Sequence, residues 1–225
     1  MSILYIVATP IGNLSDISLR ALEVLKSVEL LAAEDTRCTQ KLLTHFGIHV
    51  KLLSCRSQNE ERAAEKIIST LDRGENVAYT SDAGSPALSD PGALLVRKVV
   101  QAGHTVLPVP GPSAFAALLS IAGIFDKSVV FEGFLSPKAG RRKSRLQELL
   151  SGESAFVLYE SPYRIVKLFS DLVELDSKRS VCVGREMTKL HEEYLRGSAA
   201  EIYELLVARK EQRGEFAVCV SGKRA

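Results

Sequence analysis

Three turn-rich segments carry the small residues that could hold a polar ligand. They read TPIGN (residues 9–13), SDAGSPALSDPG (residues 81–92) and PGPSA (residues 110–114), and each follows an apolar run that is typical of a strand. In open α/β sheets, ligands bind outside the carboxyl ends of the strands. Glycines there let backbone N–H and C=O groups approach a ligand, because no Cβ stands in the way. One such turn is usually only a tight connection, whereas three on one edge favour a binding site.

The motifs of the common nucleotide and acyl-transfer sites are absent from the sequence. No GxGxxG follows the first apolar run, and neither GxxxxGK[ST] nor GxSxG occurs. A ligand at the three loops would therefore be held mainly by backbone groups and small side chains. Such a site suits an adenine, a ribose and an amino-acid tail better than a polyphosphate.

Short apolar runs alternate with helical patterns, which predicts an α/β protein with largely parallel sheets. We expect strands at residues 3–8, 30–33, 51–54, 76–80 and 105–109, and helices at 18–26, 58–73 and 91–102, the last capped by Asp90. A second set of strands and helices begins at Asp126 and Lys127. Its expected strands are residues 128–134, 154–159, 180–185 and 215–221, and its expected helices are residues 141–150, 162–172 and 199–209. We expect two α/β domains, residues 1–123 and 124–225.

The composition of the 225-residue chain is that of an ordinary globular protein. Hydrophobic residues make up 46% and charged residues 25%, which excludes disordered and collagenous chains. The net charge of +2 is too weak to indicate a nucleic-acid partner by itself. No apolar window approaches membrane-spanning length and no leader precedes the first strand, so we expect a cytoplasmic protein. The four cysteines are scattered without metal-ligand spacing, so we expect no metal site.

One segment is strongly basic. SPKAGRRKSR (residues 136–145) contains Lys138, Arg141, Arg142, Lys143 and Arg145 without an acidic residue. Such a run is often only a solvated face, but at a strand end its cations can neutralise phosphates. No aromatic residue is interleaved, so we expect the run to position RNA rather than to read its bases.

Seven motifs in order, between residue 2 and about residue 222, carry a family resemblance. They are VATPIGNLSDIS, AEDTR, SDAGSPALSDPG, PGPSA, FEGFL, YESPYR and REMTKLHEEYLRG. Together they resemble the ribosomal RNA small subunit methyltransferase I family of the tetrapyrrole methylase superfamily, whose members use S-adenosyl-L-methionine (SAM). The resemblance implies 2′-O-methylation of a cytidine in the decoding region of 16S ribosomal RNA in the 30S subunit. It also implies a homodimer of two-domain α/β chains, with the cofactor cleft between the two domains.

The resemblance also implies which residues bind. In the first domain the cofactor loops correspond to Pro10, Ile11, Gly12, Asp82, Ala83, Gly84, Ser85, Ser113 and Ala114, and in the second to Leu158, Tyr159, Met187, Phe216 and Ala217. The RNA candidates are Asp35, Arg37, Glu160 and Arg164, together with Lys138, Arg141, Arg142 and Lys143 of the basic run. The acceptor of the hydroxyl proton is left open, with Glu186 and Lys189 as the first candidates.

Two other functions are compatible with the sequence, which also differs from the family pattern in one respect. A methylase of a tetrapyrrole precursor would share mainly the glycine-rich loops, and a non-catalytic RNA-binding assembly module would share the fold without binding SAM. Family members typically extend beyond the GEFAVCVSG strand with a helical tail, whereas this sequence stops at Ala225. If that tail helps to grip the ribosome in the family, this protein must bind it in another way, or the ribosomal substrate is less favoured.

Overall fold

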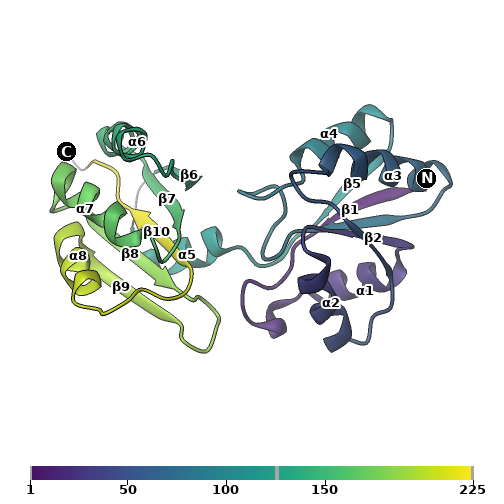
Figure 1. Ribbon diagram of the computed structural model, residues 1–225, viewed down its shortest axis with the longest axis horizontal. Coiled ribbons are helices and arrows are strands. Elements are labelled where there is room, and N and C mark those ends of the chain that lie inside the picture. The colour runs from purple at the N-terminus through teal and green to yellow at the C-terminus, as the bar shows by residue number, and fades with distance from the viewer. Residues whose placement is uncertain (1, 125–126, 224–225) are drawn as a thin grey trace. The chain divides into compact units, whose positions relative to one another are not determined.

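The computed structural model describes residues 2–124 and 127–223, and the chain divides into two compact units, Met1–Ser113 and Ala114–Ala225 (Figure 1). This boundary falls before the expected one after residue 123. The reason is that helix α5 (Ala114–Ala122) packs on strands of the second unit. The second set of strands and helices is expected to begin at Asp126, which lies outside the described residues.

The first unit is a parallel sheet with helices on both faces. Its strands are β1 (Ile3–Val7), β2 (Leu30–Ala33), β3 (Lys51–Ser54), β4 (Val77–Thr80) and β5 (Thr105–Val109), in the order β3-β2-β4-β1-β5. Its helices are η1 (Leu14–Asp16), α1 (Leu19–Ser27), α2 (Thr36–His45), α3 (Glu60–Asp72) and α4 (Ala93–Gln101). The strand positions agree with the sequence pattern, whereas α2 lies outside the expected helices.

Two hydrophobic cores hold this sheet, because its central strands are apolar on both faces. On one face Leu4, Ile67, Tyr79 and Leu95 belong to a cluster that α3 and α4 cover. On the other face Val7, Leu25, Leu31 and Leu43 belong to a second cluster beneath α1 and α2, as the two helix layers in Figure 1 show. Strands buried on both faces are typical of doubly wound parallel sheets, in which ligands bind at the loops that leave the carboxyl ends of the strands.

The second unit is a mixed sheet. Its strands are β6 (Val129–Phe134), β7 (Ala155–Glu160), β8 (Ser180–Arg185), β9 (Glu193–Ser198) and β10 (Phe216–Val220), in the order β6-β7-β10-β8-β9. Its helices are α5, α6 (Ala139–Ser151), α7 (Ile165–Asp176) and α8 (Ala199–Val207). Strands β6 and β7 are parallel, while β10 runs antiparallel to both β7 and β8. The edge strand β9 lies outside the expected elements.

The two faces of the second sheet differ. Leu158, Phe216 and Val218 point into a core shared with α6, α7 and α8. The opposite face contacts α5, where Leu118 is fully buried and lies against Gly184 and Met187. A methylene at Gly184 would come within 2.5 Å of the Met187 Sδ atom, so this face needs glycine for α5 and Met187 to pack closely.

Candidate functional site

The three glycine-rich loops meet at the carboxyl edge of the first sheet. Thr9 and Gly84 exchange two backbone hydrogen bonds, 2.9 and 3.0 Å long. The Ser85 hydroxyl donates to the Pro112 carbonyl at 3.3 Å, and the Ala8 N–H donates to Val109 O at 3.1 Å. The loops after β1, β4 and β5 are therefore linked to one another directly, as their positions on one sheet edge predict.

Two glycines allow this close approach. Gly84 has φ +74°, and a Cβ there would lie 3.3 Å from the Ile11 Cγ2 atom. A Cβ at Gly111 would lie 3.1 Å from the Ala8 Cβ atom. A side chain at either position would push the loops apart, since both separations are tighter than ordinary van der Waals contact.

The same edge holds buried hydroxyl groups that have no hydrogen-bond partner within the described residues. They are the Oγ1 atoms of Thr9 and Thr80 and the Oγ atom of Ser113. A buried hydroxyl without a partner costs free energy, and native structures rarely leave one. A cradle of backbone groups with three unpaired hydroxyls suits a ligand that carries hydroxyl, amino and carboxyl groups.

Acidic residues link the loop after β2 to the loop after β4. The Asp35 N–H donates to the Asp82 Oδ1 atom at 2.9 Å, and the Asp82 N–H donates to the Glu34 Oε2 atom at 3.3 Å. The Asp82 carboxylate therefore fixes the AEDTR segment rather than capping its own loop. Burial raises the pKa of Glu34 and the Asp82 charge adds to the rise, although the Asp82 N–H opposes it.

Helix α4 begins in a way that its sequence does not suggest. The sequence predicts Asp90 as its cap, but the N-cap residue is Gly92 and has no side-chain cap of its own. Instead the buried Glu60, at the start of α3, accepts hydrogen bonds from the N–H groups of Gly92 and Leu95, at 3.0 and 2.9 Å. Glu60 thus ties the end of the SDAGSPALSDPG loop to the neighbouring helix.

Asp90 has a different role. Burial raises its pKa to about 6, the Glu34 charge adds to the rise, and a hydrogen bond with Ser81 opposes it. Because the folded-state pKa exceeds the unfolded value, Asp90 favours folding most at low pH and loses that contribution as the pH rises through about 6.

Replacing the carboxyl with an amide should therefore stabilise the protein only at higher pH. We expect Asp90→Asn to raise the free energy of unfolding by about 1–2 kcal/mol at pH 8 and to change it little at pH 4. Urea unfolding at both pH values measures this. An equal effect at the two pH values, or a destabilised variant at pH 8, would contradict a buried carboxyl with a raised pKa.

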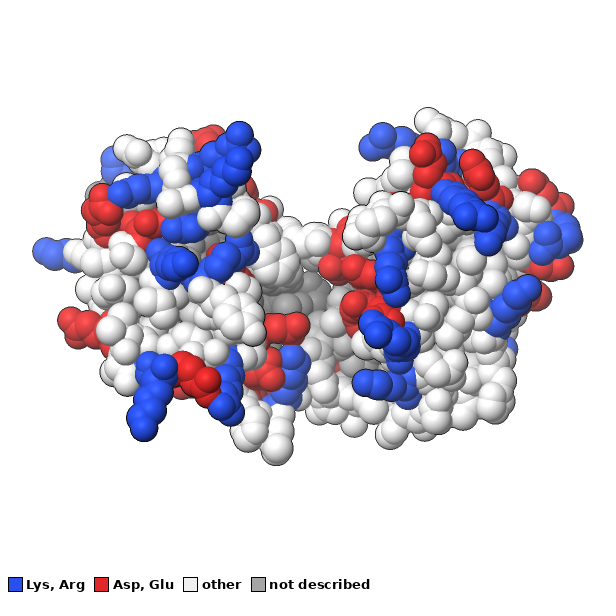
Figure 2. All heavy atoms as spheres, in the orientation of Figure 1, with Lys and Arg blue, Asp and Glu red and all other residues white. Residues whose placement is uncertain are grey.

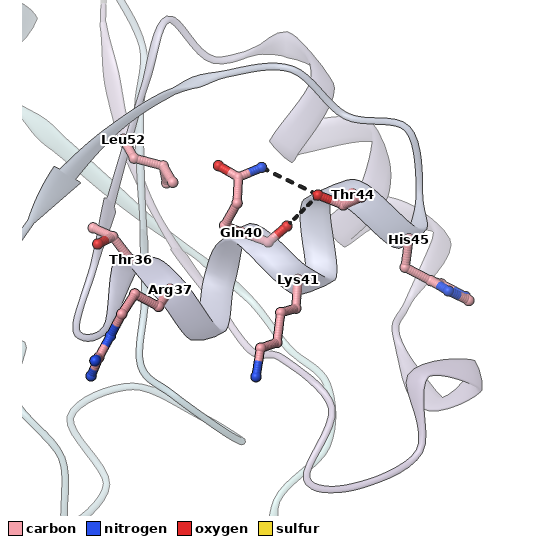
Figure 3. Close-up of a pocket in the computed structure, with 7 residues that line it drawn as sticks. All are labelled: Thr36, Arg37, Gln40, Lys41, Thr44, His45 and Leu52. Carbon is pink, nitrogen blue, oxygen red and sulfur yellow. Dashed lines mark hydrogen bonds between the residues drawn. The ribbon is translucent and has the colours of Figure 1, made fainter.

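A hollow on the first unit lies beside α2, and none of its lining residues belongs to the glycine-rich loops. It has a volume of about 840 Å³ and is lined by Thr36, Arg37, Gln40, Lys41, Thr44, His45 and Leu52. The side chains of Arg37 and Lys41 extend from the same side of α2, whereas the Gln40 side chain, on another side of the helix, hydrogen-bonds to Thr44 (Figure 3). The hollow is open and shallow, so we place the candidate site at the loops, where the glycines and the unpaired hydroxyls are.

Arg37 is less available to phosphate than its sequence context suggests. Its guanidinium pairs with both oxygens of Asp35, at 3.1 and 2.6 Å, and the side chain is 82% exposed. The hydrogen bonds from Arg37 lower the pKa of Asp35 well below its usual range. Asp35 and Arg37 therefore form one exposed ion pair at the start of α2.

In the second unit the expected cofactor residues fall on two faces of the sheet. Tyr159 and Ala217 are register partners on the face of α5, where Met187 is also buried. The Tyr159 hydroxyl accepts a hydrogen bond from the Phe115 N–H at 2.9 Å. Leu158 and Phe216 point the other way, into the core under α6 to α8. For these two residues only backbone atoms are left to contact a ligand.

Glu160 and Arg164 form a buried pair. Glu160 is 2% exposed, and its Oε1 atom lies 2.7 Å from the Arg164 Nη2 atom and accepts from the Ser161 N–H at 2.7 Å. Arg164 also donates to the Leu135 carbonyl at 3.3 Å. This burial does not fit the direct RNA contact expected of Glu160, because its carboxylate is enclosed by protein. The pair instead links the loops after β6 and β7.

Glu186 and Lys189 also pair with each other. The Lys189 Nζ atom lies 2.8 Å from both the Glu186 and the Glu215 carboxylates. Burial by itself would raise the pKa of Glu186 and lower that of Lys189, but the hydrogen bonds between them outweigh burial and shift both the other way. Lys189 thus stays protonated at neutral pH, which makes it a poor proton acceptor.

The basic run is not the uniformly free surface that its sequence suggests. Arg142 is 5% exposed, and its Nε atom donates to Asp171 at 2.7 Å. Lys143 pairs with Glu174, and Arg145 pairs with Glu132 at 2.7 Å. The burial of Arg142 and its pairing with Asp171 do not favour the RNA contact expected of this residue. Lys138 and Arg141 are exposed and have no side-chain partner in the described part of the chain.

Comparisons with known proteins show the family of this chain and agree with its α/β fold. The family model of Tetrapyrrole (Corrin/Porphyrin) Methylases matches residues 3–203. Uroporphyrin-III-C-methyltransferase from Thermus thermophilus has a similar solved structure, with a TM-score of 0.68 over 97% of this chain and 94% of that one. Its sequence identity is 16%, so this likeness concerns the fold alone.

Sequence relatives are much closer. Ribosomal RNA small subunit methyltransferase I of Borrelia garinii is 45% identical over 219 residues, which cover 97% of this chain and 98% of the relative. The Neisseria meningitidis serogroup B and Bacillus subtilis proteins of the same name are 46% and 41% identical and are covered over 74% and 76% of their lengths. The chain belongs to the tetrapyrrole methylase family and, within it, to the ribosomal RNA small subunit methyltransferase I family.

The chain is accordingly a SAM-dependent methyltransferase. The residues of the first unit fit this cofactor. Gly84 and Gly111 let backbone groups of the loops approach it closely, and the unpaired hydroxyls of Thr9, Thr80 and Ser113 match the polar groups of SAM. Within the described residues no cluster of His, Cys, Asp and Glu could hold a metal ion. No helix there is long and apolar enough to cross a membrane.

Sequence reasoning missed several residues at the site. Thr9 and Thr80 were not distinguished from ordinary strand-end residues, and the cap at Glu60 joins positions that are far apart in sequence. Outside the glycine-rich loops, Phe134 and Tyr163 lie in motifs that carry the family resemblance, and both are exposed. Only their exposure in the folded chain distinguishes them from core aromatics.

Proposed function

We propose that this enzyme methylates the ribose 2′-hydroxyl of a cytidine in the decoding region of 16S ribosomal RNA, with the 30S subunit as its substrate and the cytoplasm as its place of action. The observation that carries the proposal is a relative named ribosomal RNA small subunit methyltransferase I that is 45% identical over nearly both full lengths. The family resemblance of the AEDTR and REMTK motifs supports the same substrate.

SAM supplies an activated methyl group on a sulfonium centre, so the chain's own contribution is binding and orientation. We propose that the loops containing Pro10, Ile11 and Gly12, Asp82 to Ser85, and Ser113 hold the cofactor in the first unit. Ala114, Tyr159, Met187 and Ala217, with the backbone at Leu158 and Phe216, are the proposed contacts in the second. Orienting a ribose hydroxyl in line with the S–CH₃ bond can supply up to about 7–11 kcal/mol of barrier reduction.

The identity of the proton acceptor follows less directly. Glu186 remains the better of the two expected candidates, because it is ionised at neutral pH whereas Lys189 is held protonated by two carboxylates. We propose that Lys189 orients Glu186 and the loop after β8. A Lys189→Met variant should then lose activity while a Lys189→Arg variant keeps part of it.

A tetrapyrrole precursor is the competing substrate. It is favoured by the broad family model and by the fold, but the similar solved structure is only 16% identical. Methyl transfer from labelled SAM to 30S subunits, naked 16S RNA and uroporphyrinogen III separates the two proposals. We expect label in RNA from 30S subunits alone; label in the tetrapyrrole and none in RNA would overturn the proposal.

The two unpaired cations of the basic run should contribute to RNA affinity. We expect Lys138→Ala combined with Arg141→Ala to weaken binding to 30S subunits and to reduce the slope of log affinity against log salt by about 1.4, or about 0.7 for each lost phosphate contact. The affinity for SAM should not change.

Lys143→Ala is the matched control within the same run, because Glu174 already pairs with Lys143. It should change the salt slope less than the double variant does. If the double variant binds 30S subunits with the wild-type slope, the run is only a solvated face and RNA docks elsewhere.

We also propose a homodimer, as the resembling family forms. The apolar stretch at residues 110–123 offers only part of its surface to a partner, because Leu118 and Ala122 are already buried within the second unit. Ile121 on the same helix remains 37% exposed. Light scattering at micromolar concentration should give the mass of two chains, and a monomer would contradict the proposal.

A further inference from the structure

The loops after β6 and β7 lie together at one edge of the second sheet. The two strands are parallel neighbours, so their carboxyl ends share that edge. Arg164, in the loop after β7, donates to the Leu135 carbonyl in the loop after β6 at 3.3 Å. Each hydrogen-bonded residue has an exposed aromatic neighbour in the chain: Phe134 is 56% exposed and Tyr163 is 89% exposed.

A bulge determines which way Phe134 points. The register of β6 against β7 shifts by one residue between Phe131 and Gly133. Because side chains alternate along a strand, the extra residue places Phe134 on the same face as Phe131. Both rings lie edge-on to Tyr159, with centroids 5.1 and 5.8 Å away. Phe134 is therefore the exposed end of a packed aromatic row that holds its ring in place.

Phe134 is close in the sequence to the two free cations. Lys138 follows Phe134 by four residues, and Arg141 lies in the first turn of α6. Lys and Arg side chains gather over α6 in Figure 2. Glu160, the acid that follows β7, is buried and paired with Arg164, so it does not oppose the cations at the surface.

From this arrangement we propose that Phe134 and Tyr163 form a stacking platform for unpaired nucleobases of single-stranded RNA, with Lys138 and Arg141 contacting the adjacent phosphates. The inference rests on the proposed RNA substrate and adds how the RNA is held. Ring faces beside cations are the features by which proteins bind single-stranded nucleic acid. An apolar protein partner would use the rings without needing the cations, so RNA is the occupant that the charges favour.

The absence of tryptophan from the sequence gives a direct test. In full-length Tyr163→Trp the new side chain is the sole tryptophan, and its fluorescence should be quenched when short oligocytidylate binds and stacks on it. Inorganic polyphosphate, which has phosphates but no bases, should compete for the cations without quenching. Leu205→Trp, on the exposed face of α8, is the matched control and should not respond to either polymer.

Affinity measurements complete the test. We expect Tyr163→Ala to weaken oligocytidylate binding roughly 5- to 100-fold, Tyr163→Phe to bind nearly as the wild type does, and SAM affinity to be the same in all three proteins. Leu205→Ala controls for lost apolar surface and should bind normally. Unquenched fluorescence of the Tyr163→Trp variant, together with wild-type affinity in Tyr163→Ala, would overturn the platform even where the wild type methylates 30S subunits. If the wild type methylates only a tetrapyrrole, the proposed function fails instead.

Discussion

Gly84→Val should abolish SAM binding at concentrations that saturate the wild type, a loss of at least about 100-fold in affinity. Gly84 has φ +74°, which a β-branched residue adopts only with strain. Its new Cβ would stand 3.3 Å from the Ile11 Cγ2 atom, and the added methyl groups would meet the loop after β1. The Thr9–Gly84 hydrogen bonds that join the first two loops should then break. Calorimetric titration with SAM measures the effect.

Backbone strain alone needs its own control, and the chain offers one. Gly74 has φ +83°, but no atom lies within 4 Å of the position that a Cβ would take there. Gly74→Val should therefore lose folding stability through backbone strain alone while binding SAM normally. If both variants lose SAM affinity equally, or if folded Gly84→Val binds as the wild type does, the glycine-rich loops are not the cofactor cradle. Gly84→Ala, with a smaller side chain, should show an intermediate loss.

Glu60→Ala should have the second largest effect, through the fold of the same loop. The substitution leaves the N–H groups of Gly92 and Leu95 buried without an acceptor. Each unsatisfied buried donor costs about 1–3 kcal/mol, so we expect the free energy of unfolding to fall by about 2–4 kcal/mol. Because Gly92 ends the SDAGSPALSDPG loop, SAM affinity should fall at least about tenfold as well.

Two variants separate this cap from a general effect of charge. Glu60→Gln keeps an oxygen that can accept both hydrogen bonds, so it should retain most of the stability and of the SAM affinity. Glu61→Ala removes the neighbouring carboxylate, which is 74% exposed and pairs with Lys98, and should change neither property measurably. Urea unfolding together with SAM titration provides both readouts. A Glu61→Ala variant as impaired as Glu60→Ala would rule out the specific role of Glu60.

The sequence predicts the framework of the first unit well, because its strands are short apolar runs between strong turn signals. Residues 30–33, 51–54 and 105–109 are strands with the expected bounds. The loops that follow β1, β4 and β5 are predicted for the same reason, since the glycines mark where the chain must turn. Their meeting at one edge follows from parallel topology and is confirmed by the Thr9–Gly84 and Ser85–Pro112 contacts.

Partners that are far apart in sequence could not be predicted. Arg142 lies in a run without acids, yet Asp171, on the neighbouring helix α7, accepts its hydrogen bond. Gly92 needs a cap and Asp90 is the nearest carboxylate, yet the cap comes from Glu60, 32 residues away. Strand β9 was missed because its residues alternate weakly and are only half-buried at the edge of the sheet. In each case tertiary packing, rather than local pattern, decides the outcome.

The exposure of two aromatic rings could not be predicted from the sequence either. Phe134 follows an apolar run and would ordinarily be a core residue, but the bulge before Gly133 and the edge position leave it exposed. The basic run contains no aromatic residue, which led to the expectation that RNA is positioned without stacking. Tyr163 comes from a different loop, in which Arg164 donates a hydrogen bond to Leu135, the residue that follows Phe134.

The identity of the methylated nucleoside tests the central claim most directly. Wild-type enzyme and labelled SAM would be incubated with 30S subunits that lack the modification, and the 16S RNA would then be digested to nucleosides and analysed by mass spectrometry. We expect label in 2′-O-methylcytidine, with the flanking linkage resistant to alkali, and no label when folded Gly84→Val replaces the wild type. Label in a base-methylated nucleoside, or no label in RNA from an enzyme that binds SAM, would contradict it.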